Sequence, residues 1–232
     1  MDDYRTLKEA AWAANQDLEK SGVVLYTFGN ASAADRERDV FAIKPSGVPY
    51  EDLEPADMVV VDFHGHVVEG RMRPSSDTPT HAVLYRAFDG IGGVAHTHST
   101  YAVAWAQACQ PIPILGTTHA DLLPTDVPCT DLLTEAAVEG DYETATGELI
   151  AAHFRDRSWE EVPMVLVARH GPFAWGETAA EAVHNCVMLE ELARTAWLTM
   201  ALDPGVGRLE PWLVRKHFER KHGKDAYYGQ EQ

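Results

Sequence analysis

The chain has 232 residues, of which 45% are hydrophobic and 24% charged, a composition typical of a globular protein with a sizeable core. The 36 acidic residues outnumber the 19 basic ones, and the net charge of -17 argues against nucleic-acid binding, which needs a basic surface. No apolar run approaches the roughly 20 residues that span a bilayer, and the N-terminus lacks the features of a signal peptide. We therefore expect one domain over residues 1–232, in a cytoplasmic protein that binds neither membrane nor nucleic acid.

The first part of the sequence predicts one helix followed mainly by strands. Apolar residues at helical spacing from Leu7 to Leu18 predict the helix, which stops at Gly22. Strands are predicted over 23–28, 40–43, 58–63 and 67–69, with polar turns at 29–32, 44–47 and 64–66. A helix then opens at residues 75–79, where good capping residues precede a proline, and it runs to about residue 88.

The rest of the sequence alternates strands with helices. The predicted elements are an apolar strand over 91–98, a helix over 99–109, a short strand over 112–115, a helix from near 146, a strand over 164–168, a long helix opened by the capping box at 178–181, and a last helix from 211 to just before 223. Hairpin-type connections early in the chain and helical connections later predict an α/β protein of three α/β/α layers, with a central, mostly antiparallel or mixed sheet.

The strand over 91–98 ends in two histidines, His96 and His98. Because strand side chains alternate between faces, both imidazoles project to the same side and can bind one divalent cation. His170 ends a similar apolar strand and is the natural third imidazole. Asp77 is either a fourth ligand or a plain N-cap carboxylate of the helix that follows it. His81, one turn into that helix, is expected to be an ordinary surface or packing residue.

Three small polar loops supply groups that bind a phosphate. Helix N-terminal N–H groups and hydroxyls are good phosphate ligands, although each loop alone is more typical of a turn or cap. In a strongly acidic chain, the loops together with one lysine predict an anion cradle. Its predicted members are Gly29, Asn30, Lys44, Ser46, Gly47, Ser75 and Ser76. No Walker or G-x-G-x-x-G pattern is present, so a nucleotide is not expected.

An ordered set of segments then resembles one family closely. The segments are GNASAADRERDVFAIKPSGV (29–48), VVEGRMRPSSDTPTHAVLY (67–85), GGVAHTHS (92–99), GTTHAD (116–121), HGPFAWG (170–176), EAVHN (181–185) and KHGKDAYYGQ (221–230). They resemble the L-ribulose-5-phosphate 4-epimerases of the class II aldolase/epimerase superfamily. The resemblance implies a central sheet with flanking helices, a Zn2+ or another divalent cation such as Mn2+ or Co2+, and a homotetramer with active sites between subunits.

The resemblance also implies roles for individual residues. Asp77, His96, His98 and His170 would bind the metal, and the anion cradle would bind the sugar-phosphate substrate. Asp121 and Tyr228 would form an acid/base pair, with Tyr228 supplied by a neighbouring subunit and His217 and Arg220 assisting substrate binding. Arg169 departs from the family pattern, in which a histidine or small polar residue often precedes the metal ligand at position 170.

The expected reaction interconverts L-ribulose 5-phosphate and D-xylulose 5-phosphate. Retro-aldol cleavage of the C3–C4 bond gives the enediolate of dihydroxyacetone and glycolaldehyde phosphate, and the aldehyde rotates before the bond forms again with C4 inverted. The alternative is a class II aldolase of the fuculose-phosphate type, in which a glutamate usually follows the paired serines, whereas this chain has Asp77. A non-catalytic sugar-phosphate-binding protein and a metal-dependent dehydratase are weaker alternatives.

Overall fold

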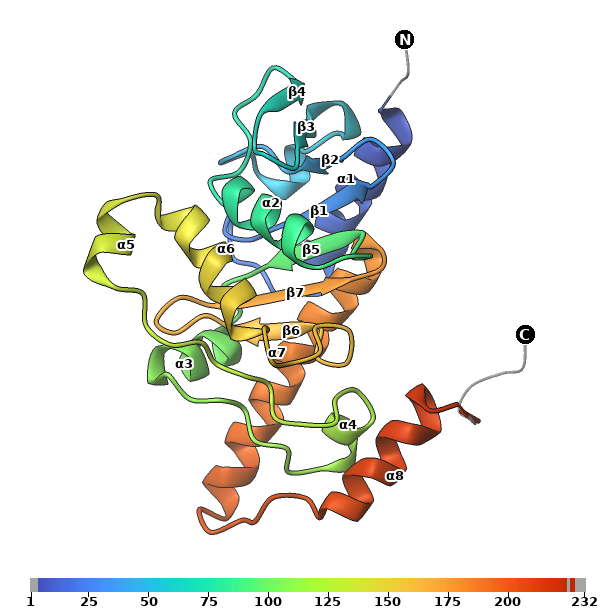
Figure 1. Cartoon of the computed structure of the whole chain (residues 1–232), viewed down its shortest axis with the longest axis vertical. Coiled ribbons are helices and arrows are strands. Elements are labelled where there is room, and N and C mark those ends of the chain that lie inside the picture. The colour runs from blue at the N-terminus through green and yellow to red at the C-terminus, as the bar shows by residue number, and fades with distance from the viewer. Residues whose placement is uncertain (1–3, 225, 228–232) are drawn as a thin grey trace.

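A seven-stranded sheet forms the centre of the molecule (Figure 1). The computed structural model describes residues 4–224, 226 and 227. The strand order is β4-β3-β2-β1-β5-β7-β6, and every pairing between neighbouring strands is antiparallel. The strands are β1 (Asn30–Asp35), β2 (Val40–Ile43), β3 (Val59–Asp62), β4 (Val67–Glu69), β5 (Gly93–His96), β6 (Met164–Leu166) and β7 (Pro172–Gly176).

Helices cover both faces of the sheet. In Figure 1, α1 and α7 lie on one face and α2 and α6 on the other, which confirms the predicted three layers. The helices are α1 (Arg5–Lys20), α2 (Thr78–Ala87), α3 (Thr100–Ala108), α4 (Thr117–Ala120), α5 (Glu135–Glu139), α6 (Tyr142–His153), α7 (Ala179–Leu202) and α8 (Pro211–His222), with two 3-10 turns at Tyr50–Asp52 and Pro55–Asp57. None of the helices in the described part of the chain combines the length and apolar character needed to cross a membrane.

Apolar periodicity positions the two helices on the α1/α7 face. The predicted stripe of α1 is buried at Ala11, Ala14 and Leu18. The long helix α7 begins as predicted, because the Thr178 side chain accepts a hydrogen bond from the Glu181 N–H. Small buried residues along α7 let it approach β5 and β7, the strands that carry the histidine cluster.

Several predicted strands differ from the structure. Residues 23–28 form a turn rather than a strand: Tyr26 has a φ of 53° and a single bridge joins Leu25 to Phe28. The side chains of Leu25, Tyr26 and Phe28 are exposed and only Val23 at the start of the segment is buried, so no strand face forms, and the strand begins after it, at Asn30. Residues 112–115 make only an isolated bridge between Ile112 and Val127.

The start of one helix was predicted wrongly and one strand was not predicted, both for local reasons. Helix α6 begins at Tyr142 rather than near 146, because the Asp141 side chain accepts a hydrogen bond from the Thr144 N–H and caps it. Strand β7 was not predicted separately, since its residues follow His170 through a tight turn that sequence periodicity does not resolve. Strand β7 pairs with β5 and β6, and so it brings His170 next to His96.

Candidate active site

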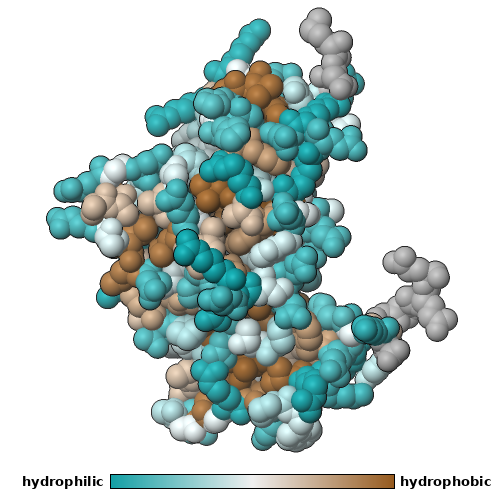
Figure 2. Space-filling view, in the orientation of Figure 1, coloured by the Kyte–Doolittle hydropathy of each residue, from teal (hydrophilic) through white to brown (hydrophobic). Residues whose placement is uncertain are grey.

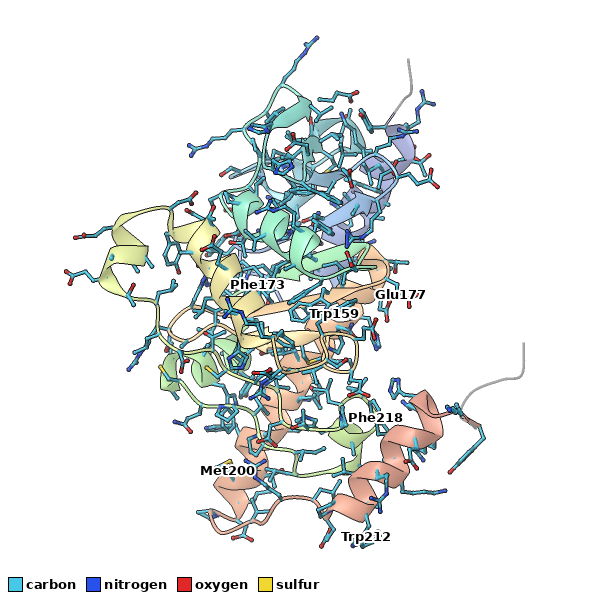
Figure 3. All side chains as sticks on the ribbon, viewed as in Figure 1. Trp159, Phe173, Glu177, Met200, Trp212 and Phe218 are labelled. Carbon is cyan, nitrogen blue, oxygen red and sulfur yellow. The ribbon has the colours of Figure 1, made fainter. Side chains whose placement is uncertain are left out.

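Three histidines converge where β5 ends and β7 begins. The ligand nitrogens of His96, His98 and His170 all lie within 4.8 Å of one another. The His96 ring stacks on Phe173 of β7, with centroids 4.1 Å apart, and Figure 3 labels this phenylalanine. His96 Nδ1 donates a hydrogen bond to the Pro172 carbonyl at 2.9 Å, so the proton of the neutral ring lies on Nδ1 and the Nε2 lone pair is free.

The spacing of the imidazole nitrogens fits a bound cation. His96 Nε2 lies 3.1 Å from His98 Nε2. Two neutral imidazole nitrogens face each other at this distance without repulsion only when a proton or a cation lies between them. Two nitrogen ligands about 2.0–2.1 Å from a tetrahedral Zn2+ would lie about 3.3 Å apart, close to the observed distance. The donor set therefore fits a divalent metal ion.

The third histidine is held by an unusual backbone conformation. Arg169, directly before His170, has a φ of 63°, in the left-handed region that non-glycine residues avoid. Its N–H donates to the Ala106 carbonyl at 2.8 Å and its guanidinium to the Gln107 carbonyl at 2.6 Å, both in the last turn of α3. Arg169 thus caps α3 and fixes the turn that presents His170, while its own side chain is exposed.

Asp77 is a buried carboxylate beside the histidines rather than a helix cap. Its side chain makes no capping hydrogen bond to α2, and its Oδ2 accepts one from Asn30 Nδ2 at 2.6 Å. Burial acts to raise the pKa of Asp77, but the imidazoles of His96 and His81 and the Asn30 amide outweigh it and hold that pKa below the ordinary value. The carboxylate is therefore ionised at neutral pH, as metal binding requires.

The histidines open onto a cleft of about 380 Å³. The structure brings every predicted member of the anion cradle to the walls of this one cleft, together with Asp77, His98 and His170. The members of the cradle are Gly29, Asn30, Lys44, Ser46, Gly47, Ser75 and Ser76. Gly29 has a φ of 105°, and a Cβ atom there would lie 3.0 Å from the His96 carbonyl oxygen, so glycine is required next to the cluster.

Lys44 is the one cation that lines the cleft within the described part of the chain. Its ammonium donates to the Val48 carbonyl at 2.5 Å and lies 4.8 Å from the centre of the Tyr50 ring. Burial lowers the pKa of Lys44 to about 8, so the side chain is still mostly charged at pH 7. An anion that enters the cleft therefore meets one positive charge held at a fixed position.

Sequence patterns missed five residues that line the cleft, namely Thr27, Phe28, Pro45, Tyr142 and Glu143. The Tyr142 hydroxyl lies 3.1 Å from His170 Nδ1, and burial raises its pKa, so it stays protonated. The Phe28 ring lies 5.8 Å from that of His98. An aromatic residue at the start of a helix carries no recognisable signal. Only the capping Asp141, which fixes where α6 begins, could have pointed to Tyr142.

Of the predicted acid/base pair, Asp121 lies away from the cleft. Asp121 follows α4 and pairs with two residues of α8: His217 Nδ1 at 2.9 Å, and the Arg220 guanidinium at 2.9 and 2.6 Å. Burial acts to raise the pKa of Asp121, but its hydrogen bonds from Arg220 and His217 prevail and lower it. None of these three residues lines the cleft, and α4 and α8 lie together at one end of the molecule (Figure 1). Tyr228 lies outside the described residues.

Comparison with known proteins identifies the family. The family described as "Class II Aldolase and Adducin N-terminal domain" matches residues 9–197. The chain belongs to this family. It is 53% identical over 224 residues to "L-ribulose-5-phosphate 4-epimerase UlaF" of Salmonella paratyphi A, an alignment that covers 97% of this chain and 98% of the Salmonella protein.

Solved structures of this class II aldolase family have the same fold. An L-fuculose 1-phosphate aldolase superposes with a TM-score of 0.77 at 26% identity and covers 93% of this chain and 95% of the aldolase. The L-fuculose-1-phosphate aldolase of Thermus thermophilus gives a TM-score of 0.66 at 27% identity, with 90% of this chain and 100% of the aldolase covered. The predicted class II aldolase-like fold is therefore confirmed.

Proposed function

We propose that the chain is a metal-dependent L-ribulose-5-phosphate 4-epimerase that interconverts L-ribulose 5-phosphate and D-xylulose 5-phosphate. One observation carries the proposal: a single cleft joins a three-histidine cluster and a buried carboxylate to an anion cradle containing one lysine. The near full-length similarity to a Salmonella L-ribulose-5-phosphate 4-epimerase supports this substrate over a ketose 1-phosphate.

The cleft divides into two parts with different chemistry. His96, His98, His170 and Asp77 would hold a divalent ion, Zn2+ or one of similar size, which supplies Lewis-acid stabilisation of negative charge as the C3–C4 bond breaks. Lys44 and the hydroxyls and N–H groups of the cradle bind the phosphate at C5. Because the aldehyde fragment carries this phosphate, the cradle keeps the fragment in the cleft while it rotates.

Inversion at C4 requires proton transfer on two opposite sides of the aldehyde. One group removes the proton of the C4 hydroxyl before cleavage, and the other returns a proton after the opposite face has been attacked. We assign these roles to Asp121 and Tyr228. His217 and Arg220 hold the Asp121 carboxylate ionised and oriented, so that it can hold a proton-accepting oxygen at a fixed position.

The active site would be completed by a second subunit of a homotetramer. Asp121, His217 and Arg220 do not line their own subunit's cleft, so a neighbouring copy must bring such a group to it. Exposed apolar side chains at the end of α7 and the start of α8, including Trp197, Leu202 and Trp212, provide a surface for association. Figure 2 shows hydrophobic residues at this lower end, as one of several apolar patches on the face.

The activity is tested by NMR of the zinc-loaded protein with L-ribulose 5-phosphate beside a chelated control. The proposal predicts D-xylulose 5-phosphate only in the loaded sample. Unchanged substrate, together with cleavage of a ketose 1-phosphate to dihydroxyacetone phosphate and an aldehyde, would instead identify an aldolase.

The shared site is tested by exchanging subunits between two inactive variants, His98→Asn and Tyr228→Phe. Random mixing would restore about a quarter of the sites if each site combines His98 of one subunit with Tyr228 of another. If both residues belong to the same subunit, no activity returns.

A further inference from the structure

A buried histidine that the proposed reaction does not use lies behind the metal cluster. His81 of α2 has no exposed surface, and its Nδ1 lies 2.8 Å from the Ser32 hydroxyl of β1. The Ser32 hydroxyl lies 2.7 Å from the Tyr85 hydroxyl, and both of these residues are also buried. The sequence predicted an ordinary surface or packing residue at position 81. The structure instead places His81 in a buried hydrogen-bond network with Ser32 and Tyr85.

The hydrogen bonds among Tyr85, Ser32 and His81 all run in the same direction, from Tyr85 to His81. Burial raises the pKa of Tyr85, so its hydroxyl keeps its proton and must donate it. Ser32 Oγ is the partner found for that proton, which leaves the Ser32 hydroxyl to donate to His81 Nδ1. A hydroxyl that donates to Nδ1 needs a free lone pair there, so the single proton of the buried His81 ring lies on Nε2.

The resulting Nε2–H group is a buried donor without a partner among the described residues. Buried polar groups in native proteins are nearly always hydrogen-bonded, so this donor calls for a partner. His81 lies four residues after Asp77, and side chains at that spacing meet on one face of a helix. The His81 N–H also donates to the Asp77 carbonyl at 3.1 Å, so the two residues face each other across the first turn of α2.

We propose that His81 is a positioning residue, whose Nε2–H donates through one bridging water to the Asp77 carboxylate and orients it as a metal ligand. Asn30 already holds Oδ2 of this carboxylate. A second donor fixes the rotation of the carboxylate, so that one lone pair faces the histidine cluster. The hydrogen bonds from Tyr85 to Ser32 and from Ser32 to His81 Nδ1 place the His81 proton on Nε2, the nitrogen that would donate toward Asp77. The inference rests on the proposed role of Asp77 as a ligand.

Two substitutions separate the two ends of the His81 ring. In His81→Gln the side-chain amide nitrogen can replace Nε2, which keeps the donor toward Asp77 but loses the contact with Ser32. In His81→Asn the amide oxygen can replace Nδ1, which keeps the contact with Ser32 but loses the donor. Each full-length variant is stripped of metal, its Zn2+ dissociation constant is measured by competition with a chromogenic chelator, and the thermal unfolding of the metal-free form is recorded.

We expect His81→Asn to weaken Zn2+ binding by about 10- to 100-fold, as is usual for loss of a group that orients a ligand, and His81→Gln to stay close to the unaltered protein. In an Asp77→Asn background, His81→Asn should cause no further loss, because the carboxylate it orients is gone. Equal Zn2+ affinities for the Gln and Asn variants, or a shift in unfolding with unchanged Zn2+ binding, would show a purely structural role.

Failure of the inference is distinguishable from failure of the proposed function. If Asp77→Asn weakens Zn2+ binding while His81→Asn does not, only the role of His81 is overturned. If neither the unaltered protein nor any variant binds Zn2+, the metal site itself is wrong and the inference falls with it.

Discussion

The pKa of Lys44 predicts how substrate binding depends on pH. Lys44 is the cation of the cleft, and burial lowers its pKa to about 8. A substrate phosphate, whose second pKa is about 6, is dianionic throughout the range above pH 7 and does not titrate there. Loss of the Lys44 proton should therefore weaken binding of the sugar phosphate as the pH rises through 8. Substitution by methionine removes the charge at every pH.

The size of the effect follows from the charged fraction. With a pKa of about 8, Lys44 is about 90% charged at pH 7 and about 10% charged at pH 9. If only the charged form binds phosphate well, the KM of the unaltered enzyme rises about tenfold over this range. A hydrogen bond to a charged group contributes about 1.5–3 kcal/mol, so Lys44→Met should raise KM about 10- to 100-fold at pH 7.

The decisive assay compares KM for L-ribulose 5-phosphate in the two proteins from pH 7 to 9, at constant ionic strength and saturating metal. The ratio of the KM value of Lys44→Met to that of the unaltered enzyme should fall about tenfold from pH 7 to pH 9, with a midpoint near the pKa of about 8. A ratio that stays constant over this range would refute the role of Lys44 as the titrating phosphate ligand.

Three other substitutions test the supports of the cleft. Arg169→Gly removes the left-handed strain that Arg169→Ala keeps. The Gly variant should therefore be about 1 kcal/mol more stable to denaturant than the Ala variant, and equal stabilities of the two variants would argue against strain. Gly147→Ala places a Cβ 2.7 Å from Val83 Cβ between α2 and α6 and should cost about 1–3 kcal/mol, whereas Gly207→Ala, in open space, serves as a neutral control. Tyr142→Phe, which loses the contact with His170, should weaken Zn2+ binding about tenfold with little change in thermal unfolding; unchanged Zn2+ affinity would contradict this.

Local patterns predicted the groups that lie close together in sequence. His96 and His98 belong to one strand end, and the paired serines directly precede Asp77, so spacing alone brought these residues together. His170 could be added because it ends another apolar strand. These are the cases in which the period of a strand or the start of a helix determines where a side chain lies.

Features that depend on tertiary packing could not be predicted in the same way. The proposed role of His81 depends on Ser32 and Tyr85. Ser32 lies on strand β1, and Tyr85 lies one turn further along α2. The strand predicted over 23–28 does not form because Leu25, Tyr26 and Phe28 are exposed, and exposure depends on tertiary packing, which the hydrophobic pattern does not contain. Asp121 was predicted from the resemblance alone, and its pairing with α8 spans almost a hundred residues.

Proton NMR in D2O of zinc-loaded protein with L-ribulose 5-phosphate tests the central claim most directly. Retro-aldol cleavage, rotation and re-addition break no C–H bond at C3 or C4. The account therefore predicts metal-dependent formation of D-xylulose 5-phosphate that retains protium at both carbons. Deuterium at C3 or C4 of the product, or epimerisation that persists after the metal is chelated, would contradict it.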